Sequence, residues 1–399
     1  MVRRRIIVLA AAFAIATAAS TAIAEQRGGK DGKEQQPKRS KQEQVEIDQL
    51  VKTVDGVMAG QPAPGDIQMS LTPYFLKSQE QRTFVPFVLD VQSLPATDVA
   101  LYVRVVQAGG SSPSAADSAA DSAAAAAAAQ PKPTDKPDAG KPPARPEYPW
   151  DDIHFISAAQ LSGAAVTTPT ATTGQPASPT QTDSSVDRKA GGAPGRIYRV
   201  FMAPPGTYDV YIAMKEREPE KGPKPATGPR MGVLKTQVTV PDFWNGDLMT
   251  SSVIVADKVN VLTAMPSPEE ARERPFVFGA QELVPAADTA FSKEEQLATF
   301  FQVYNAQLDP AGQPNLILEY NFHRTEDGVE KFFNKTAPQE VNASMLPPTF
   351  DPTKFPIPGG IEVPLKSFPE GEYRLEIKVT DKVSGKVVTR DVNFTVKAS

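Results

Sequence analysis

A short pattern of turn and strand residues occurs twice in this chain. The first copy is Pro-Pro-Gly206-Thr-Tyr208 and the second is Pro369-Glu-Gly371-Glu-Tyr373, each followed by an alternating apolar stretch. The two glycines are as far apart along the chain as the two tyrosines. Self-similarity at a fixed spacing is the signature of a duplicated structural unit. The sequence therefore predicts two copies of one β-module.

The stretch that follows each tyrosine indicates which side chains enter a core. Apolar and polar residues alternate there, which is typical of an antiparallel strand with one buried face and one solvated face. We expect the apolar set to face a core in each module and the polar set to face outward. The apolar set is Val210, Ile212 and Met214 in the first copy and Tyr373, Leu375, Ile377 and Val379 in the second, and the outward set is Asp209 with Arg374, Glu376 and Lys378.

Strand-like segments separated by turn residues recur along the rest of the chain. About seven short strands per module favour an all-β fold of two tandem immunoglobulin-like or fibronectin-type β-sandwiches, with a short N-terminal helix and disordered insertions. The strands expected in the first module are 67–75, 83–91, 99–106, 197–202, 208–214, 233–240 and 252–255, with a short island at 151–158 that could reach a core, and those in the second are 276–284, 297–305, 315–323, 361–365, 372–380 and 386–396.

The N-terminus has the three parts of a secretory signal. Three arginines at 3–5 precede an apolar run at 6–19, and Ala22-Ile-Ala24 offers a small-residue cleavage site. The run is shorter than the ~20 residues of a spanning helix. We expect residues 1–24 to be a signal peptide, the mature chain to have no membrane span, and the protein to be periplasmic or secreted. The chain contains no cysteine, so its stability must come from core burial.

Composition divides the remaining chain into ordered and low-complexity segments. Residues 25–44 hold almost nothing apolar, which predicts a disordered tether, and apolar residues then recur at helical spacing from Val45 to Met58, before Gly60. Two stretches rich in Ala, Ser, Thr and Pro cannot offset their ordering entropy and read as disordered insertions. The expected organisation is a first sandwich at 45–262 with insertions at 107–149 and 163–194, a linker at 263–275 and a second sandwich at 276–399.

Charge and motif content bound the function. A net charge of −5 with scattered basic residues argues against a nucleic-acid or anionic-membrane surface. The histidines are His154 and His323, each in an alternating strand pattern, and no metal-ligand, phosphate-loop or nucleophile motif occurs. We expect a protein that is not an enzyme and needs no cofactor. Calcium could use Asp151 with Asp152, or Asp242 with Asp247, but neither pair has the spacing of a calcium loop.

Aromatic residues in loops are the candidate ligand contacts. Tyr148 and Trp150 end the first insertion, and Phe243 and Trp244 lie in Pro-Asp-Phe-Trp-Asn-Gly. Exposed aromatic rings could stack on sugars or anchor a protein partner. The alternative is that these rings plug the ends of a sandwich.

Residues 195–399 resemble a known kind of exported β-rich region. The residues that carry the likeness are Pro204 to Ile212, Val238 to Phe243, Ser251 to Val255, Arg274 to Gly279 and Thr299 to Tyr304. They look like the C-terminal β-rich region of exported acidobacterial proteins, which accompanies von Willebrand factor A related domains or the family named for its Gly-Trp-x-Thr-Asp motif. The Asp-x-Ser-x-Ser metal signature and the Gly-Trp-x-Thr-Asp motif are absent from the sequence, so no functional residue carries over. The resemblance implies an exported β-sandwich accessory protein.

These observations together favour one function over a second. The first is a non-catalytic, exported, envelope-associated interaction or structural protein with a protein or glycan partner in the cell envelope. The alternative is a carbohydrate-binding module or an accessory to a secreted hydrolase, which rests on Trp150 and Trp244.

Overall fold

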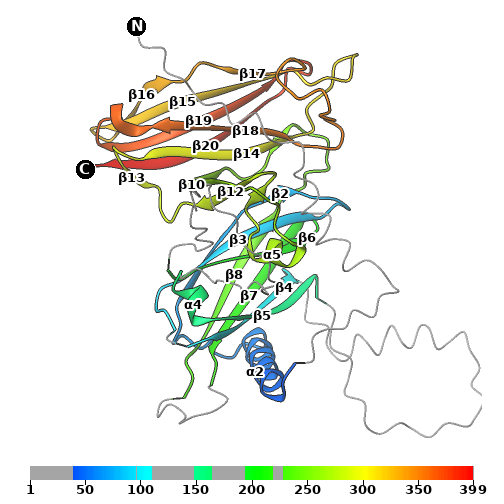
Figure 1. Ribbon diagram of the computed structural model, residues 1–399, viewed down its shortest axis with the longest axis vertical. Coiled ribbons are helices and arrows are strands. Elements are labelled where there is room, and N and C mark those ends of the chain that lie inside the picture. The colour runs from blue at the N-terminus through cyan, green and yellow to red at the C-terminus, as the bar shows by residue number, and fades with distance from the viewer. Residues whose placement is uncertain (1–38, 96, 110–147, 164–193, 219–227, 399) are drawn as a thin grey trace, which may run out of the picture.

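A computed structural model of the chain describes residues 39–95, 97–109, 148–163, 194–218 and 228–398 (Figure 1). The expected signal peptide and nearly all of the expected insertions lie outside these residues, as does the expected tether up to residue 38. The described chain is mostly β-strand, arranged in four sheets with a few short helices. The expectation of an all-β sandwich fold is confirmed.

Sheets A and B form the first sandwich. Sheet A has the strand order β5-β4-β7-β8, and in sheet B the strands β1, β2 and β6 all pair with β3. The bounds in sheet A are β4 (Val99–Gln107), β5 (Trp150–Ile156), β7 (Gly206–Glu216) and β8 (Met231–Val240), and those in sheet B are β1 (Met69–Pro73), β2 (Leu76–Lys77), β3 (Thr83–Val91) and β6 (Arg196–Ala203).

Sheets C and D form the second sandwich. Sheet C has the order β11-β12-β10-β14-β18 with β9 on β14, and sheet D has the order β13-β20-β19-β15-β16 with β17 on β15. The bounds in sheet C are β9 (Met249–Thr250), β10 (Ile254–Val261), β11 (Val277–Phe278), β12 (Gln281–Pro285), β14 (Gln296–Tyr304) and β18 (Ile357–Pro364), and those in sheet D are β13 (Ala290–Ser292), β15 (Leu316–Glu326), β16 (Val329–Lys335), β17 (Gln339–Val341), β19 (Gly371–Asp381) and β20 (Val387–Lys397).

The two sandwiches are built on the same strand plan, which accounts for the sequence repeat. β4, β5, β7 and β8 pair in the same order as β15, β16, β19 and β20, and β3 pairs with β6 as β14 pairs with β18. The repeated glycine opens β7 in one copy and β19 in the other. Gly206 and Gly371 have φ values of 149° and 145°, a region that other residues rarely adopt.

The repeated tyrosine closes the same corner in both copies. The Tyr208 hydroxyl donates to the carbonyl oxygen of Pro204 at 3.0 Å, and the Tyr373 hydroxyl donates to that of Pro369 at 2.6 Å. A tyrosine that bonds the backbone a few residues upstream is a recurring feature of β-sandwiches. The residues expected to face the cores do so. Val210, Ile212 and Met214 lie in the first core, and Leu375, Ile377 and Val379 lie in the second.

The four sheets stack face to face, and each contact between them is an apolar core. Sheets A and B enclose one core and sheets C and D enclose another. A third core joins sheet B to sheet C and contains Val88 of β3, Ile254 of β10 and Phe300 of β14. Sheets A and D are the outer sheets of the stack, and β19 of sheet D accordingly alternates between buried and half-exposed residues, whereas β4 of sheet A is buried along nearly its whole length because a helix covers its outer face.

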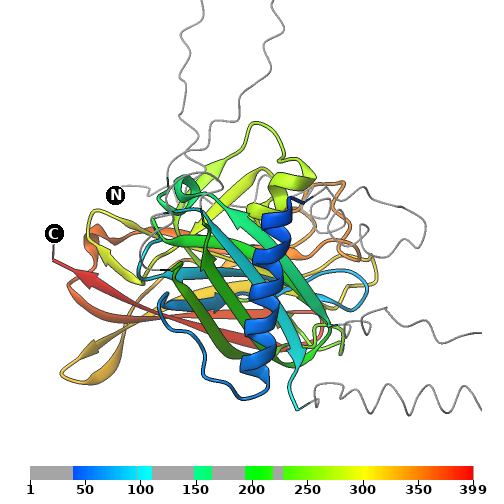
Figure 2. The same cartoon turned by 90° about the horizontal axis from the view of Figure 1, so that it is seen from below.

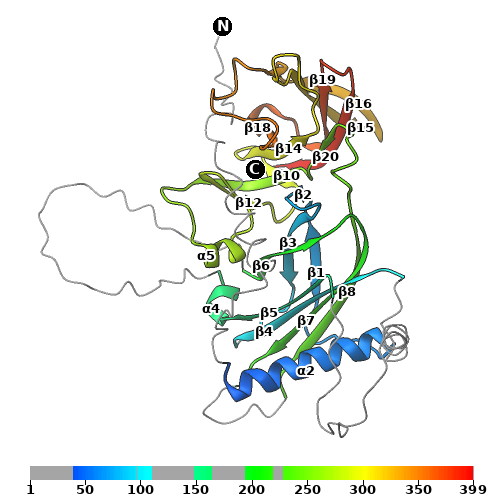
Figure 3. The same ribbon diagram turned by 90° about the vertical axis from the view of Figure 1, so that its right-hand side faces the viewer.

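One helix covers the outer face of sheet A (Figures 2 and 3). Helix α2 (Lys41–Met58) packs Leu50 and Val54 against Ala100 and Ala213 of the sheet. The helix begins at Lys41, within the segment expected to be a tether, because Ser40 and Glu43 form a reciprocal capping box. The start expected at Val45 is therefore wrong by one turn.

The chain crosses between the sandwiches earlier than the sequence indicates. The strand expected near 252–255 was assigned to the first module, and this is wrong. β10 pairs with β12 and β14, and β9 pairs with β14, so both belong to sheet C. The expected linker at 263–275 includes helix α5 (Pro268–Glu273), which lies against β6 of the first sandwich. Alternation alone indicates a half-buried strand but not the sheet that it joins.

The tyrosine corners give a matched pair of predictions. Tyr208→Phe and Tyr373→Phe should each lower the free energy of unfolding by about 1 kcal/mol, because each removes one hydrogen bond and leaves a carbonyl unpaired. Tyr148→Phe is the control, since the described residues give its hydroxyl no hydrogen bond. Urea denaturation measures all three. Equal midpoints for Tyr373→Phe and Tyr148→Phe would show that the corner adds no stability.

The core between sheets B and C predicts that the two sandwiches unfold together. Phe276 is 2% exposed and its ring lies 5.4 Å from Tyr74 and 5.8 Å from Tyr198, both of the first sandwich. Phe276→Ala should cost about 3 to 5 kcal/mol. In a Trp244→Phe background the fluorescence of Trp150 reports the first sandwich, and its urea midpoint should fall.

The exposed ring of Phe332 supplies the control for that measurement. It is 60% exposed on β16, so Phe332→Ala should change the free energy of unfolding by no more than about 0.5 kcal/mol. If Phe276→Ala left the midpoint seen by Trp150 unchanged, the two sandwiches would be independent in stability.

Candidate functional site

A pocket of about 410 Å³ opens where the two sandwiches meet. Three segments line it: residues 77–79, which begin with the last residue of β2, residues 303–308 at the end of β14, and residues 352–357, which end with the first residue of β18. The first segment belongs to sheet B and the other two to the second sandwich. The volume lies at the lower end of the range for small-molecule sites, which is about 300 to 1,000 Å³.

A buried tyrosine fixes the back of the pocket. The hydroxyl of Tyr304 accepts the backbone N–H of Lys77 at 3.0 Å and donates to Oε1 of Gln302 at 2.7 Å. Burial raises the pKa of Tyr304 well above its usual value. The ring packs edge to face on Phe243, with centroids 4.9 Å apart. Tyr304 therefore contacts β2 of the first sandwich through its hydroxyl. Its ring contacts the loop at 241–248, which connects β8 of the first sandwich to β9 of the second.

The side chain of Asn305, at the end of β14, binds both β2 and the loop at 241–248. Its amide donates to the carbonyl oxygens of Phe243 at 2.9 Å and Asp247 at 2.8 Å, and its Oδ1 accepts from Nζ of Lys77 at 2.8 Å. Its φ is 58°, in the left-handed region where asparagine is among the more tolerated residues. The amide thus uses both donors and one acceptor to hold the junction.

Left-handed backbone gathers at this junction. Among the described residues other than glycine, positive φ occurs at Glu80, Gln81, Asn305 and Asp327. Asn305 lines the pocket, and Glu80 and Gln81 directly follow the lining residue Gln79. Such conformations cost free energy and persist where surrounding structure enforces them, often at functional sites. Glu80 and Gln81 are the central residues of the β2–β3 hairpin turn, which the Arg82 N–H closes on the Gln79 carbonyl oxygen, and such a turn requires positive φ at both, so Asn305 is the left-handed residue that belongs to the pocket.

The charged groups of the pocket are cationic. Its lining includes Lys77 and Lys354 and, within the described residues, no Asp or Glu. Burial lowers the pKa of Lys77, and the nearby Asp242 partly opposes that shift. Lys354 is exposed and pairs with Asp351 at 3.0 Å. Lys77 is thus the partly desolvated cation of the pocket and Lys354 is a cation at its rim.

Ser78 adds a hydroxyl that is not satisfied within the protein. Its Oγ is buried and makes no hydrogen bond within the described residues, although the serine lines the pocket. Buried polar atoms are nearly always hydrogen-bonded in folded proteins. The hydroxyl thus lies beneath the pocket surface, and the Lys77 ammonium is the donor that borders the pocket on this side.

The four candidate aromatics do not form one binding surface. Trp150 is 7% exposed and lies in the first core, and Phe243 is 1% exposed, so both are packing residues. The half-buried Tyr148 ring lies 4.3 Å from the guanidinium of Arg104. Trp244 is half-buried with Nζ of Lys77 5.7 Å from its ring centre. Two of the four therefore lie beside the pocket: Trp244 contacts Lys77, and the buried Phe243 packs on Tyr304.

The candidate catalytic and metal residues are dispersed. His154 of β5 lies 3.7 Å from Asp152, and His323 of β15 lies 3.7 Å from Glu330, in different sandwiches. The backbone N–H of Trp244 donates to Asp242 at 2.9 Å, and Lys386 pairs with Asp247 at 3.2 Å. Across the described residues, acidic, histidine and cysteine side chains form no cluster that could hold a metal ion. No helix in the described chain is long and apolar enough to cross a membrane.

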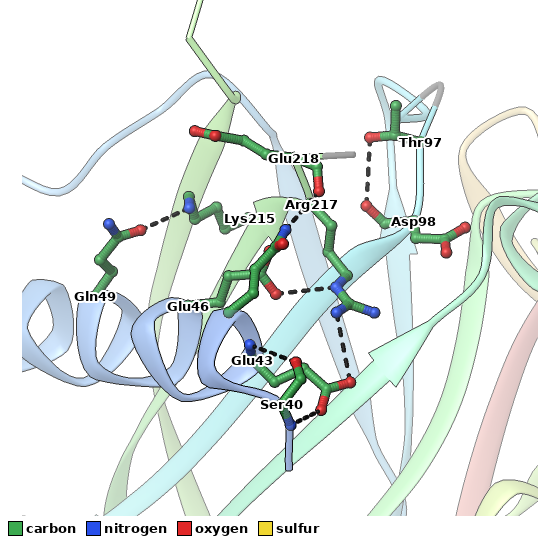
Figure 4. Close-up of polar contacts among 10 residues, drawn as sticks. Ser40, Glu43, Glu46, Gln49, Thr97, Asp98, Lys215, Arg217 and Glu218 are labelled. Atoms are coloured by element: carbon green, nitrogen blue, oxygen red, sulfur yellow. Dashed lines mark hydrogen bonds and ion pairs between the residues drawn. The ribbon is translucent and has the colours of Figure 1, made fainter. Parts of the chain in front are cut away.

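A separate polar cluster fastens α2 to sheet A (Figure 4). Nε of Arg217 donates to Glu46 at 2.9 Å, and its Nη2 lies 3.5 Å from Glu43. Nζ of Lys215 donates to Gln49 at 2.6 Å. Further along the helix, the buried Arg104 pairs with Asp55. The charges of the helix and of the sheet thus satisfy one another, which indicates a structural role for this cluster.

Comparison with known proteins gives a remote likeness. No protein-family model and no curated protein matches the chain. Among solved structures it is similar to Salmonella alpha-2-macroglobulin reacted with methylamine (12% identity, TM-score 0.18) and to the native conformation of E. coli alpha-2-macroglobulin (10% identity, TM-score 0.17). Each match covers 84% of this chain but only 17% and 16% of the respective macroglobulin. The chain thus spans less than a fifth of either protein.

His154 makes the stability of the fold depend on pH. Burial, with added repulsion from Arg199 and Arg272, lowers the pKa of His154 from 6.5 to about 4, against the attraction of Asp152. Below pH 6.5 the unfolded chain gains a proton at this site that the folded chain does not, so stability falls as the pH falls towards 4. The loss between pH 7 and 5 is about 2 kcal/mol, at ~1.4 kcal/mol for each unit.

His154→Gln isolates this contribution. Between pH 7 and 5 the variant should lose about 2 kcal/mol less than the wild type in urea denaturation, since its side chain does not titrate. His323 is present in both proteins and cancels in the comparison. An equal loss in both proteins would place the origin of the pH dependence at other groups.

Proposed function

We propose that this protein is a non-catalytic, exported module of the cell envelope that binds a partner molecule in the pocket between its sandwiches. The observation that carries the proposal is the construction of the pocket at a fixed junction. Its walls come from both sandwiches, and the core between sheets B and C together with Tyr304 and Asn305 holds them in register. A preformed concave site with a few fixed polar groups is the usual form of a ligand site.

Export and the structural role rest on further observations. The arginines, apolar run and small-residue site at 1–24 support secretion into the periplasm or the medium. An apolar interface that involves several strands of each of two sheets supports a stiff body, because flexible domain pairs have smaller and more polar contacts. Such a body suits a protein that presents a site at a fixed position in an envelope assembly.

The carbohydrate alternative now depends on Trp244 alone, since Trp150 is part of a core. A glycan array on the purified protein tests it. Sugar binding that is lost on Trp244→Ala would favour that alternative, and its retention after Trp244→Ala would exclude stacking on this ring as the cause.

Site-directed photo-crosslinking in the producing cells tests the proposal. A photoreactive residue at Lys354, on the rim of the pocket, should give a discrete envelope-derived adduct. The same residue at Lys331, on the far strand β16, should not. Thr353→Trp adds a bulky ring to the lining and should abolish the adduct. An adduct that survives Thr353→Trp, or that forms equally from Lys331, would overturn the proposal.

A further inference from the structure

We propose that the pocket between the sandwiches recognises a small carboxylate that carries an apolar group. In this assignment Lys77 and Ser78 receive the carboxylate oxygens, and the wall around Phe355 receives the apolar group. The inference deepens the proposed function and rests on it, because it takes the pocket as the binding site.

The first argument is the unused hydrogen-bonding capacity of Lys77. An ammonium has three donors, and one of them is used on Oδ1 of Asn305 at 2.8 Å. The described residues give Nζ no second hydrogen bond, and the contact with the Trp244 ring stabilises the charge without accepting a directed bond. Burial has already removed part of its hydration, as the direction of its pKa shift indicates. An anion placed in the pocket would satisfy both the charge and the free donors.

The second argument is the neighbouring hydroxyl. The Oγ of Ser78 has less than 1 Å² of exposed surface and is unpaired, and other atoms of Ser78, which follows Lys77 directly, line the pocket, so in this assignment a rotation about χ1 turns the hydroxyl to the ligand. A carboxylate has two oxygens that only accept hydrogen bonds, and hydrogen bonds to an ionised acceptor are stronger than neutral ones. A neutral sugar could satisfy Ser78 but would leave the charge of Lys77 with only the partial compensation that Asp242 provides. A metal cation would be repelled by the two lysines.

The third argument is the apolar remainder of the lining. Val303, Leu308, Phe355 and Ile357 form much of the wall, together with Pro352 and Pro356. This wall offers nothing to a fully polar anion such as phosphate, whereas an apolar group gains by leaving water there. A cavity of about 410 Å³ is small for a drug-sized ligand. Its size and chemistry fit one amino-acid-sized unit, such as an N-acylated amino acid or the last residue of a peptide.

Calorimetric titration of the purified protein tests the carboxylate directly. N-acetylphenylalanine should bind, and its amide should bind at least about tenfold more weakly, because the amide is uncharged. Phosphate and glucuronate separate charge from apolar contact and should bind more weakly than N-acetylphenylalanine. A tetrapeptide that ends in phenylalanine distinguishes a peptide terminus from a free small acid. Equal affinity for the acid and the amide would overturn the inference.

Variants assign the binding to the named side chains. Lys77→Gln should weaken binding of N-acetylphenylalanine at least about tenfold, Lys77→Arg should restore most of it, and Ser78→Ala should weaken it by a smaller factor. Lys52→Gln, on the exposed face of α2, is the matched control. Thr353→Trp should block binding. Binding that is insensitive to Lys77→Gln or to Thr353→Trp would place it elsewhere and overturn the inference, and unchanged melting temperatures exclude misfolding as the cause.

The two proposals fail in different ways. If none of the carboxylates binds while the Lys354 adduct still forms and is still blocked by Thr353→Trp, the ligand class is wrong and the proposed function stands. If N-acetylphenylalanine binds with the expected variant profile but no envelope adduct forms, the ligand assignment stands and the envelope partner is wrong.

Discussion

The apolar contact between sheets B and C is the interaction on which the rest of the structure depends. Without it the chain would be two separate sandwiches joined at their ends, since each already has its own core. With it, Val88 and Leu76 of one sandwich are buried by Ile254 and Phe300 of the other. The relative position of the two halves is then set by side-chain packing, which tolerates few alternative arrangements. The pocket inherits that fixed geometry because its walls come from both halves.

The outer faces of the two sandwiches differ in how they are protected from water. Sheet A presents small and aromatic residues, and α2 buries them. The equivalent face of sheet D instead carries charged side chains that pair across neighbouring strands, as Lys378 does with Glu319 and Arg374 does with Asp391. Exposed pairs of this kind contribute little stability each. They keep the face soluble, so that this copy needs no covering helix.

Much of the fold could be predicted from the sequence, because the relevant signals are local. The glycine and tyrosine of each corner act on backbone within four residues, and alternation in β19 reports one buried face directly. The sheet that β10 joins could not be read in this way, since an alternating strand pairs equally well with several neighbours. Ser40 and Glu43 have the spacing of a capping box, which can be recognised in a sequence. They lie within residues 25–44, where the polar composition predicts a disordered tether, and the start of the helix was therefore missed.

The pocket was beyond sequence reasoning for a different reason. Its lining comes from three segments that are far apart in the chain and contain no motif. Lys77 and Ser78 are ordinary residues at the end of a two-residue strand, and only the packing of the two sandwiches desolvates them. The aromatic residues were poor indicators of the site, because a tryptophan next to a loop can also point into a core, as Trp150 does.

The covering helix also constrains the order in which the chain can fold. α2 ends at Met58, whereas the sheet that it covers is incomplete until β7 and β8 have been synthesised, up to Val240. Most of the stability of a helix in a protein comes from packing its amphipathic face, so the capping box alone cannot hold it. During synthesis its apolar stripe has no partner for most of the time taken to make the first half of the chain. The first helix of the described chain is thus among the last elements of its own sandwich to dock.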